Sequence, residues 1–180
     1  SKNIGAFGDG GAVVVKDKGL ADDFRVFRNY GSEKRYYNKV VGANSRLDEI
    51  QAGLLRVRLK HADECEQERR SIAERYLREL NNPKLMLPGV RKGATAVWHQ
   101  FVVRCEERDA LMEYLAQKEI GTIIHYPIPP HLSEAYSYLG YQKGAFPITE
   151  RYAAEVLSLP MYNGMTEEEQ TYVIEALNAF

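Results

Sequence analysis

The sequence predicts an α+β fold, in which strands and helices mix without a regular β-α-β repeat. Two observations lead to this prediction. Apolar residues recur at helical spacing through a long central segment, and in the last half of the chain short apolar runs typical of strands lie between amphipathic segments. The composition, 44% hydrophobic and 27% charged among 180 residues, is ordinary for a folded globular protein.

The N-terminal part is expected to contain a turn, a strand, a helix and a loop. Residues 8–11 form a glycine-rich turn cluster, and the apolar run 12–15 after it predicts a short, fully buried strand. Apolar residues at i, i+4 and i+7 predict a helix over 19–30. The polar, tyrosine-rich segment 31–44 is expected to be a long loop, and such loops in compact proteins are often functional.

One long helix is expected in the middle of the chain. Ser45 is a good N-cap, and Asp48 and Glu49 would lie in the first turn, where the helix dipole favours negative charge. An apolar stripe continues from there to Leu80, before an Asn-Asn-Pro stop. About 35 residues at a 1.5 Å rise would span roughly 50 Å. We therefore expect the helix to bridge two domains or to bend near residues 62–65.

The remainder of the chain predicts a mixed unit of strands and helices. Trp98 and Phe101 are expected to anchor its core. Thr166 with Glu169 three residues later has the pattern of a capping box. The expected elements are strands over 96–105 and 122–126 and helices over 109–118, 133–139, 147–157 and 166–178.

Charge, hydropathy and cysteine usage exclude several classes of protein. The net charge is −1 and the basic residues are spread out, so no nucleic-acid-binding surface is indicated. No apolar run approaches the length of about 20 residues that a transmembrane helix needs. Cys65 and Cys105 lack metal-ligand or redox spacing, so no metal site is expected and both are interpreted as reduced residues of a cytoplasmic protein. A start at Ser1, directly before a glycine turn, suggests part of a longer or processed chain.

The residues that could carry chemistry are ambiguous when they are considered alone. Lys2 lies beside a glycine-rich turn, and a Schiff-base lysine needs close backbone neighbours, but most lysines are solvated surface charges. His125 is more typical of a strand histidine with a satisfied hydrogen bond. The basic and tyrosine residues around Lys34 and Tyr36 could form a polar wall over a substrate, although taken alone they are more typical of an exposed loop.

Three ordered segments resemble signatures of the DegT-type sugar aminotransferases, which depend on pyridoxal phosphate (PLP). Residues 1–13, beginning Ser-Lys-Asn-Ile-Gly, are similar to the segment that carries the PLP lysine. Residues 42–52, Gly-Ala-Asn-Ser-Arg-Leu-Asp-Glu-Ile-Gln-Ala, resemble the next signature. The third is Ile-Ile-His-Tyr-Pro at 123–127, followed by His131 and Tyr136. The three segments follow one another in order and are distributed over most of the chain, from residue 1 to residue 136.

The resemblance implies a fold-type-I enzyme, of which this chain is the C-terminal half. Residues 1–55 would be the end of the large PLP-dependent transferase domain. Residues 56–82 would form a long bridging helix, and residues 83–180 a small α/β C-terminal domain. The N-terminal half would supply the acidic partner of the pyridine nitrogen, which keeps PLP an electron sink. The 180 residues alone are therefore expected to be nearly inert.

The resemblance also implies a role for each matching residue. Lys2 would bind PLP covalently and then carry a proton, and Asn44 would contact the PLP phosphate of the neighbouring subunit in a homodimer with shared active sites. Five further residues would contact the nucleotide sugar and its diphosphate, for which arginine and other polar side chains are suitable hydrogen-bond donors. This set is Arg46, His125 and Tyr126, with Lys34 and Tyr36 in the substrate wall.

The activity implied is transfer of an amino group from an amino acid, with glutamate as the expected donor, to a nucleotide-linked keto sugar. The sequence of residues 44–49 resembles family members that act at carbon 3 more than those that act at carbon 4. A dTDP-linked 3-keto-6-deoxyhexose is therefore the expected substrate. This would place the protein in deoxyamino sugar synthesis for lipopolysaccharide or other glycans. Two alternatives stay open. One is a PLP-dependent sugar dehydratase, although those lack the lysine, and the other is a non-catalytic nucleotide-sugar-binding or regulatory protein.

Overall fold

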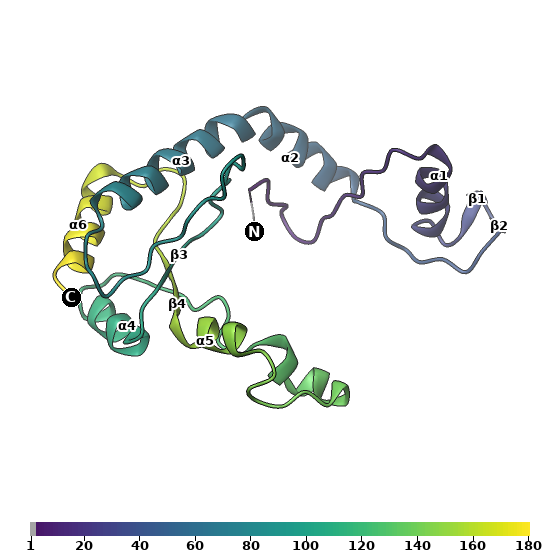
Figure 1. Cartoon of the computed structure of the whole chain (residues 1–180). Helices are drawn as coiled ribbons and strands as arrows, with labels where there is room; N and C mark the ends of the chain where they lie inside the picture. Colours follow the sequence, from purple (N-terminus) through teal and green to yellow (C-terminus); the bar gives the residue numbers. More distant parts are fainter. Residues whose placement is uncertain (1–2) are drawn as a thin grey trace. The chain divides into compact units, whose positions relative to one another are not determined.

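The computed structural model describes residues 3–180, and it divides into two compact units (Figure 1). Unit 1 ends at Ala62, and unit 2 runs from Asp63 to Phe180. Each unit is held together by its own internal contacts. Lys2, which the resemblance makes the PLP lysine, lies outside the described residues.

Unit 1 contains two helices and a small hairpin. Helix α1, Lys18–Phe27, begins where the Asp17 carboxylate accepts a hydrogen bond from the Leu20 amide at 2.7 Å, and it confirms the helix predicted over 19–30. Strands β1, Ser32–Lys34, and β2, Tyr37–Asn38, pair antiparallel. The segment expected to be a loop is therefore a short hairpin.

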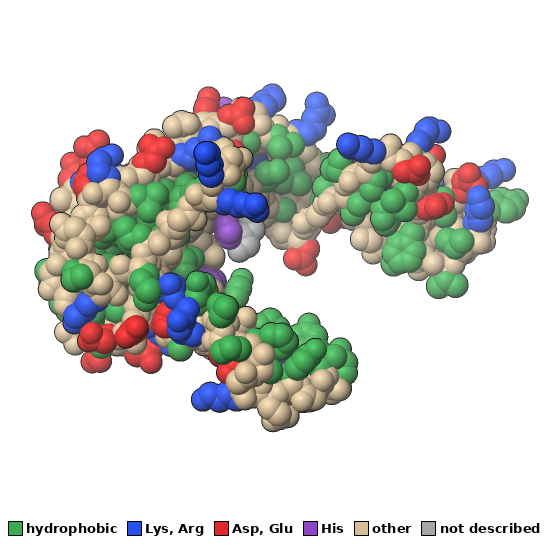
Figure 2. All heavy atoms as spheres, in the orientation of Figure 1, with side chains coloured by type: hydrophobic (Ala, Val, Ile, Leu, Met, Phe, Trp, Pro, Cys, Tyr) green, Lys and Arg blue, Asp and Glu red, His purple; other side chains and the backbone are tan. Residues whose placement is uncertain are grey.

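The apolar run 12–15 is not a buried strand, and that prediction was wrong. Val14 is 93% exposed, and none of the described residues pairs with this segment. A strand needs hydrogen-bonding neighbours as well as apolar side chains, since its backbone groups cannot be satisfied within the segment. The apolar face of α1, with Phe24 and Phe27, is also exposed, and Figure 2 shows hydrophobic side chains on the surface of this unit.

The predicted long helix is two helices, α2 over Glu49–Lys60 and α3 over Ala62–Glu79. The break falls at His61, whose φ of −110° and ψ of 8° leave the helical region, one residue before the expected bend. Asp48, rather than Ser45, occupies the N-cap of α2. Ser45 cannot start the helix because its amide donates to the Arg28 carbonyl at 2.9 Å, which ties it to the end of α1.

Unit 2 is built around a pair of antiparallel strands. β3, Phe101–Arg104, pairs with β4, Val156–Leu159, from Phe101 opposite Leu159 to Arg104 opposite Val156. Single bridges flank the pair, from Met86 to Arg104 and from Ile123 to Ser158. The other elements are α4 (Arg108–Gln117), the 3₁₀ helices η1 (Pro130–Leu132) and η2 (Glu134–Leu139), α5 (Pro147–Glu155) and α6 (Glu167–Asn178).

The core of unit 2 lies where α3, α4 and α6 pack on the strand pair. Phe101 is fully buried and Trp98 packs on it with ring centroids 5.4 Å apart, which confirms the predicted anchors. Burial of each such side chain contributes on the order of 1.5–3 kcal/mol. The buried Tyr76 hydroxyl donates to the Pro160 carbonyl at 2.8 Å, and desolvation raises the pKa of this phenol. The other large side chains that are fully buried in the core belong to Val103, Cys105, Leu111, Leu115, Leu157 and Leu177.

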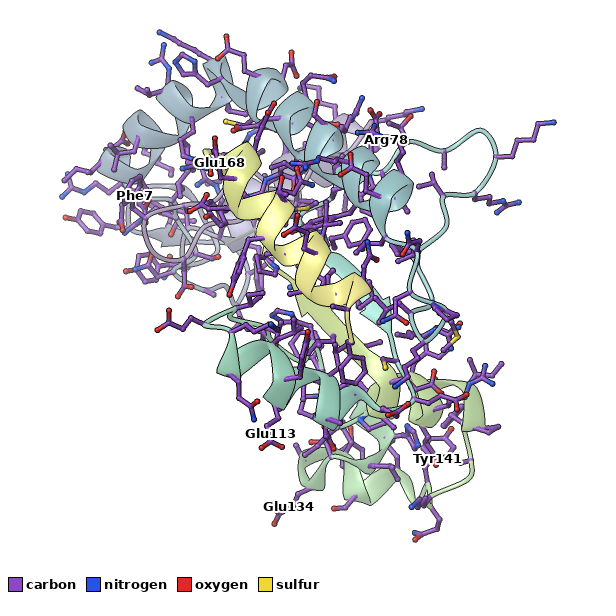
Figure 3. The ribbon with its side chains drawn as sticks, turned by 90° about the vertical axis from the view of Figure 1, so that its left-hand side faces the viewer. Phe7, Arg78, Glu113, Glu134, Tyr141 and Glu168 are labelled. Atoms are coloured by element: carbon purple, nitrogen blue, oxygen red, sulfur yellow. The ribbon has the colours of Figure 1, made fainter. Side chains whose placement is uncertain are left out.

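The capping box of α6 is confirmed. The Thr166 hydroxyl accepts from the Glu169 amide at 3.1 Å, and the Glu169 carboxylate accepts from the Thr166 amide at 2.8 Å. Figure 3 shows α6 with Glu168 labelled near its N-terminal end. The strand predicted over 122–126 is reduced to the single bridge of Ile123.

The described residues contain neither a membrane-spanning helix nor a cluster of metal-ligating side chains. None of the helices within residues 3–180 is long and apolar enough to cross a bilayer. Among the same residues no group of three or more histidine, cysteine or acidic side chains is placed to hold a metal ion. Cys65 and Cys105 are both free thiols, and burial raises the pKa of Cys105.

Candidate functional site

In unit 1, the candidate residues Asn44 and Arg46 lie on the strand-like segment that returns from the hairpin toward α2. Asn44 forms a backbone bridge with Asn29. The Tyr30 amide donates to the Ala43 carbonyl and the Ala43 amide to the Phe27 carbonyl, both at 2.9 Å. These bonds join the segment to the C-terminal end of α1, so the backbone that carries both candidates is fixed.

Two glycines allow that close backbone approach. A Cβ atom on Gly42 would lie 2.2 Å from the Gly31 nitrogen and 2.5 Å from the Phe27 carbonyl oxygen. Gly31 has a φ of +71°, which L side chains rarely adopt, and a Cβ there would lie 1.8 Å from the Val40 oxygen. The base of the hairpin therefore excludes any side chain at either position.

The Arg46 side chain is held in one direction by two neighbours. Its Nη1 donates to the Asn29 side-chain oxygen at 2.7 Å, and its guanidinium carbon lies 5.1 Å from the centre of the Tyr30 ring. The guanidinium group carries five N–H donors, so most of them stay available to an anion. Asn29 was not predicted from the sequence, because no local pattern shows that its side chain binds Arg46, 17 positions later.

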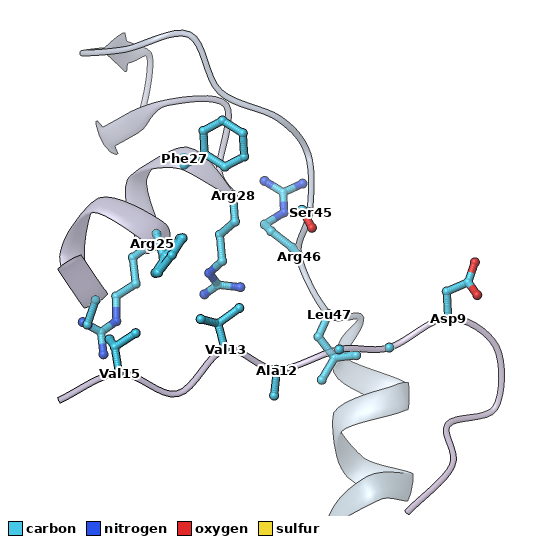
Figure 4. Close-up of a pocket in the computed structure, with 14 residues that line it drawn as sticks. Asp9, Ala12, Val13, Val15, Arg25, Phe27, Arg28, Ser45, Arg46 and Leu47 are labelled. Carbon is cyan, nitrogen blue, oxygen red and sulfur yellow. The ribbon is translucent and has the colours of Figure 1, made fainter. Parts of the chain in front are cut away.

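Arg46 also lies at an open pocket of unit 1 (Figure 4). Arg25, Arg28 and Arg46 contribute its basic groups, and the Arg25 guanidinium is paired with Asp22 at 2.6 Å. The rest of the lining is mostly apolar. It consists of Asp9, Gly10, Gly11, Ala12, Val13, Val15, Ala21, Phe24, Phe27, Ser45 and Leu47.

The residues present fit a phosphate-bearing ligand. The Asn44 side chain is exposed and makes no hydrogen bond within residues 3–180, so its amide donors are available. Arg46 offers charge-assisted donors two positions further along the same segment. A neutral amide donor and a guanidinium group together suit phosphate oxygens.

Lys34 and Tyr36 lie on the hairpin, in an exposed setting. The Lys34 ammonium lies 5.1 Å from the centre of the Tyr37 ring, and the Arg35 guanidinium carbon lies 4.9 Å from the centre of the Tyr36 ring. Tyr36 is 83% exposed and has a φ of 72°. The hairpin thus displays cations and aromatic rings, an arrangement consistent both with a substrate wall and with a solvated loop.

In unit 2, His125 and Tyr126 follow the bridge at Ile123. The His125 Nδ1 lies 2.8 Å from the Ser158 hydroxyl of β4, and the His125 and Tyr126 rings meet edge to face, 5.4 Å apart. His125 is half-buried, whereas Tyr126 is exposed. Ser158 was not found from the sequence, since its relation to His125 spans 33 positions.

A second polar cluster fixes the segment that follows His125 and Tyr126. Glu150 on α5 accepts hydrogen bonds from the Gly144 amide at 2.8 and 2.9 Å and from the Phe146 amide at 3.2 Å, and its Oε1 lies 3.1 Å from His131 Nε2. The Gly144 hydrogen bonds, followed by the His131 contact, hold the pKa of Glu150 below its ordinary value. The cluster connects η1, the turn before α5 and α5 itself.

The candidate residues thus fall into two groups. Asn44, Arg46, Lys34 and Tyr36 belong to unit 1, and the first two lie within one short segment. His125 and Tyr126 belong to unit 2.

Comparison with known proteins identifies the family. A family model of the DegT/DnrJ/EryC1/StrS aminotransferases matches residues 1–178. The dTDP-3-amino-3,6-dideoxy-α-D-galactopyranose transaminase of Aneurinibacillus thermoaerophilus is 49% identical over 171 residues, which are 95% of this chain and 47% of that protein. The erythromycin biosynthesis sensory transduction protein EryC1 of Saccharopolyspora erythraea is 48% identical over 179 residues, 99% of this chain and 49% of that protein.

A solved structure agrees with this assignment. The crystal structure of Streptomyces venezuelae DesV, in complex with a ketimine intermediate, superimposes with a TM-score of 0.96 at 43% identity, over 98% of this chain and 48% of that one. The mixed α and β architecture is thus that of an aminotransferase of known structure. The chain spans about half the length of the curated relatives it matches. It belongs to the DegT/DnrJ/EryC1/StrS aminotransferase family.

Proposed function

We propose that the chain is the C-terminal half of a PLP-dependent sugar-nucleotide aminotransferase. The observation that carries the proposal is the segment 44–46, whose rigid backbone carries an exposed amide and, two positions later, an oriented guanidinium. The amide makes no hydrogen bond within residues 3–180. Such a pair suits an anionic ligand. Family membership supports PLP as the cofactor, because these aminotransferases are PLP-dependent.

PLP, when bound, supplies an electron sink for carbanion chemistry at the carbon that loses or gains the amino group. In the proposal, the Lys2 amine holds the cofactor and moves a proton at the reacting carbon. Asn44 donates to the phosphate of a PLP bound in the neighbouring subunit, so that each active site of a homodimer is shared. The free Asn44 amide supports this role, since no neighbour within residues 3–180 uses its donors.

The remaining candidates are proposed to hold the nucleotide sugar. Arg46 contacts its diphosphate, as does His125, and Tyr126 contributes an exposed ring and hydroxyl next to that histidine. Lys34 and Tyr36, on the exposed hairpin, contribute to the wall around the substrate. None of these side chains needs to move a proton, because they act by binding and orientation.

The substrate proposed is a dTDP-linked 3-keto-6-deoxyhexose, with glutamate as amino donor. Support comes from the Aneurinibacillus relative, whose name describes a transaminase of a dTDP-linked 3-amino-3,6-dideoxy sugar. We place the protein in the cytoplasm, in deoxyamino sugar synthesis for lipopolysaccharide or other glycans.

A regulatory role is the second candidate, because EryC1 is named a sensory transduction protein. One experiment separates the two. The full-length protein, loaded with PLP, is incubated with glutamate and a panel of dTDP- and UDP-linked keto sugars. Formation of an amino sugar from a dTDP-linked 3-keto sugar supports the enzyme, whereas tight sugar binding without turnover on any member supports the regulator.

A further inference from the structure

Ser158 is a buried hydroxyl whose direction is set by its backbone. It is only 6% exposed. On one side it pairs with Val102 of β3, and on the other its amide donates to the Ile123 carbonyl at 2.8 Å while its carbonyl accepts from the Ile123 amide at 3.3 Å. Because its backbone groups are bonded to Ile123 on one side and β3 lies alongside on the other, the side chain has little freedom to turn away.

The partner of that hydroxyl is the His125 ring. Ser158 Oγ lies 2.8 Å from His125 Nδ1, and His125 is only two positions after the residue that pairs with Ser158. A buried hydroxyl needs a hydrogen-bond partner, and this contact supplies one. It also occupies one of the two ring nitrogens, so only Nε2 remains for a ligand.

The tautomer follows from which group donates. If the hydroxyl donates to Nδ1, the neutral ring must carry its proton on Nε2. Nε2–H is then a donor, which is what an oxygen of a diphosphate requires. The opposite arrangement would offer the diphosphate a lone pair and would repel it.

We propose that Ser158 is a positioning residue that donates to His125 Nδ1, fixes the ring and its tautomer, and so presents Nε2–H to the nucleotide sugar. This inference rests on the proposed function for the ligand, while the Ser158–His125 contact stands on the geometry of unit 2. Ser158 itself touches no substrate.

The first test is spectroscopic and needs no turnover. Full-length protein is labelled with ¹⁵N-histidine, and the His125 signals are assigned by their loss in His125→Ala. At mildly alkaline pH, where histidine rings are neutral, we expect a protonated Nε2 and a non-protonated Nδ1 in the wild type. In Ser158→Ala the two shifts should move toward the values of a tautomer mixture, and Ser158→Thr should restore them. Unchanged shifts in Ser158→Ala would overturn the proposal.

The second test is a double-mutant cycle read by dTDP affinity. Ser158→Ala should weaken dTDP binding about fivefold, the factor for one neutral hydrogen bond. In a His125→Ala background the same substitution should change the affinity by less than about twofold, because Ser158 acts through the ring. A fivefold loss in both backgrounds would show that Ser158 acts on the fold and would overturn its role.

Thr171→Val is the matched control. The Thr171 hydroxyl accepts from Arg75 at 2.6 Å and donates to the Glu167 carbonyl at 2.7 Å, so the variant removes a half-buried hydroxyl of the same unit with no contact to His125. It should leave dTDP affinity and the His125 signals unchanged, and a loss equal to that of Ser158→Ala would overturn the specific role.

Failure of the proposed function looks different. If His125→Ala binds dTDP as the wild type does, His125 does not hold the nucleotide, and the functional part of this inference falls with that assignment. If His125→Ala weakens binding and Ser158→Ala does not, the role of Ser158 alone is wrong.

Discussion

Substituting Gly42 with alanine should disorganise the segment that carries Asn44 and Arg46. The new Cβ would lie 2.2 Å from the Gly31 nitrogen and 2.5 Å from the Phe27 oxygen. Both are backbone atoms, so no rotamer change relieves the clash. Ordinary van der Waals contact begins at 3.4 Å, so the hairpin base has to open by more than 1 Å at the Gly31 nitrogen. Overpacking of this kind costs roughly 1–3 kcal/mol.

Gly53→Ala is the matched control. Gly53 lies within α2, and among the described residues nothing is within 4 Å of its Cβ position. Alanine in a helix interior is favoured over glycine by about 0.5–1 kcal/mol. The two substitutions are chemically identical, but their effects should have opposite signs.

The assay is urea unfolding of the full-length protein together with hydrogen exchange of the hairpin amides. Gly42→Ala should lower the midpoint and speed exchange at the Tyr30 and Ala43 amides, whereas Gly53→Ala should raise or preserve the midpoint. Cofactor retention should fall in Gly42→Ala, because Asn44 is displaced. If both variants keep wild-type exchange at Tyr30 and Ala43, the account of the hairpin base is wrong.

Three further predictions concern the site. Asn44→Ala should weaken PLP retention in a dimer, and mixing it with Lys2→Ala should restore some activity, since one site of the heterodimer carries neither lesion; an active monomer on gel filtration would contradict this. His125→Ala should raise the KM for the keto sugar by one to two orders of magnitude, from about 1.5–3 kcal/mol lost at a charged group, and stopped-flow kinetics should show a much smaller change in the amino-acid half-reaction. The lowered pKa of Glu150 means that its carboxylate stabilises the fold fully above the ordinary value of about 4.3 and loses this effect as pH falls through the lowered value. In Glu150→Gln the free energy of unfolding should therefore fall less steeply as the pH is lowered through the acidic range. An unchanged pH dependence in this variant would count against the Gly144 contacts.

Local signals were predictable from the sequence. The Thr166–Glu169 capping box acts within one turn, so the start of α6 could be read from residues three apart. The helical spacing of Phe24 and Phe27 likewise predicted α1, and burial of Phe101 followed from its apolar aromatic side chain.

Features that depend on distant partners were missed. Strand β4 continues directly from α5, and only pairing with β3, over 50 positions earlier, distinguishes it from a longer helix. The roles of Asn29 and Ser158 depend on contacts across 17 and 33 positions, which no periodicity reports. The roles given to Lys2 and Asn44 came from resemblance, because a lysine or an asparagine alone carries no signal for PLP.

The most direct test of the central claim is a two-step measurement on full-length protein with Lys2 intact or replaced by alanine. PLP-loaded wild type is treated with glutamate, cleared of excess amino acid and then given the dTDP-linked 3-keto-6-deoxyhexose, while cofactor absorbance and amino-sugar product are recorded. The account predicts that the wild type passes the amino group to the sugar, and that Lys2→Ala loses both the protein-linked absorbance band and the product. Near-normal product from Lys2→Ala would contradict it.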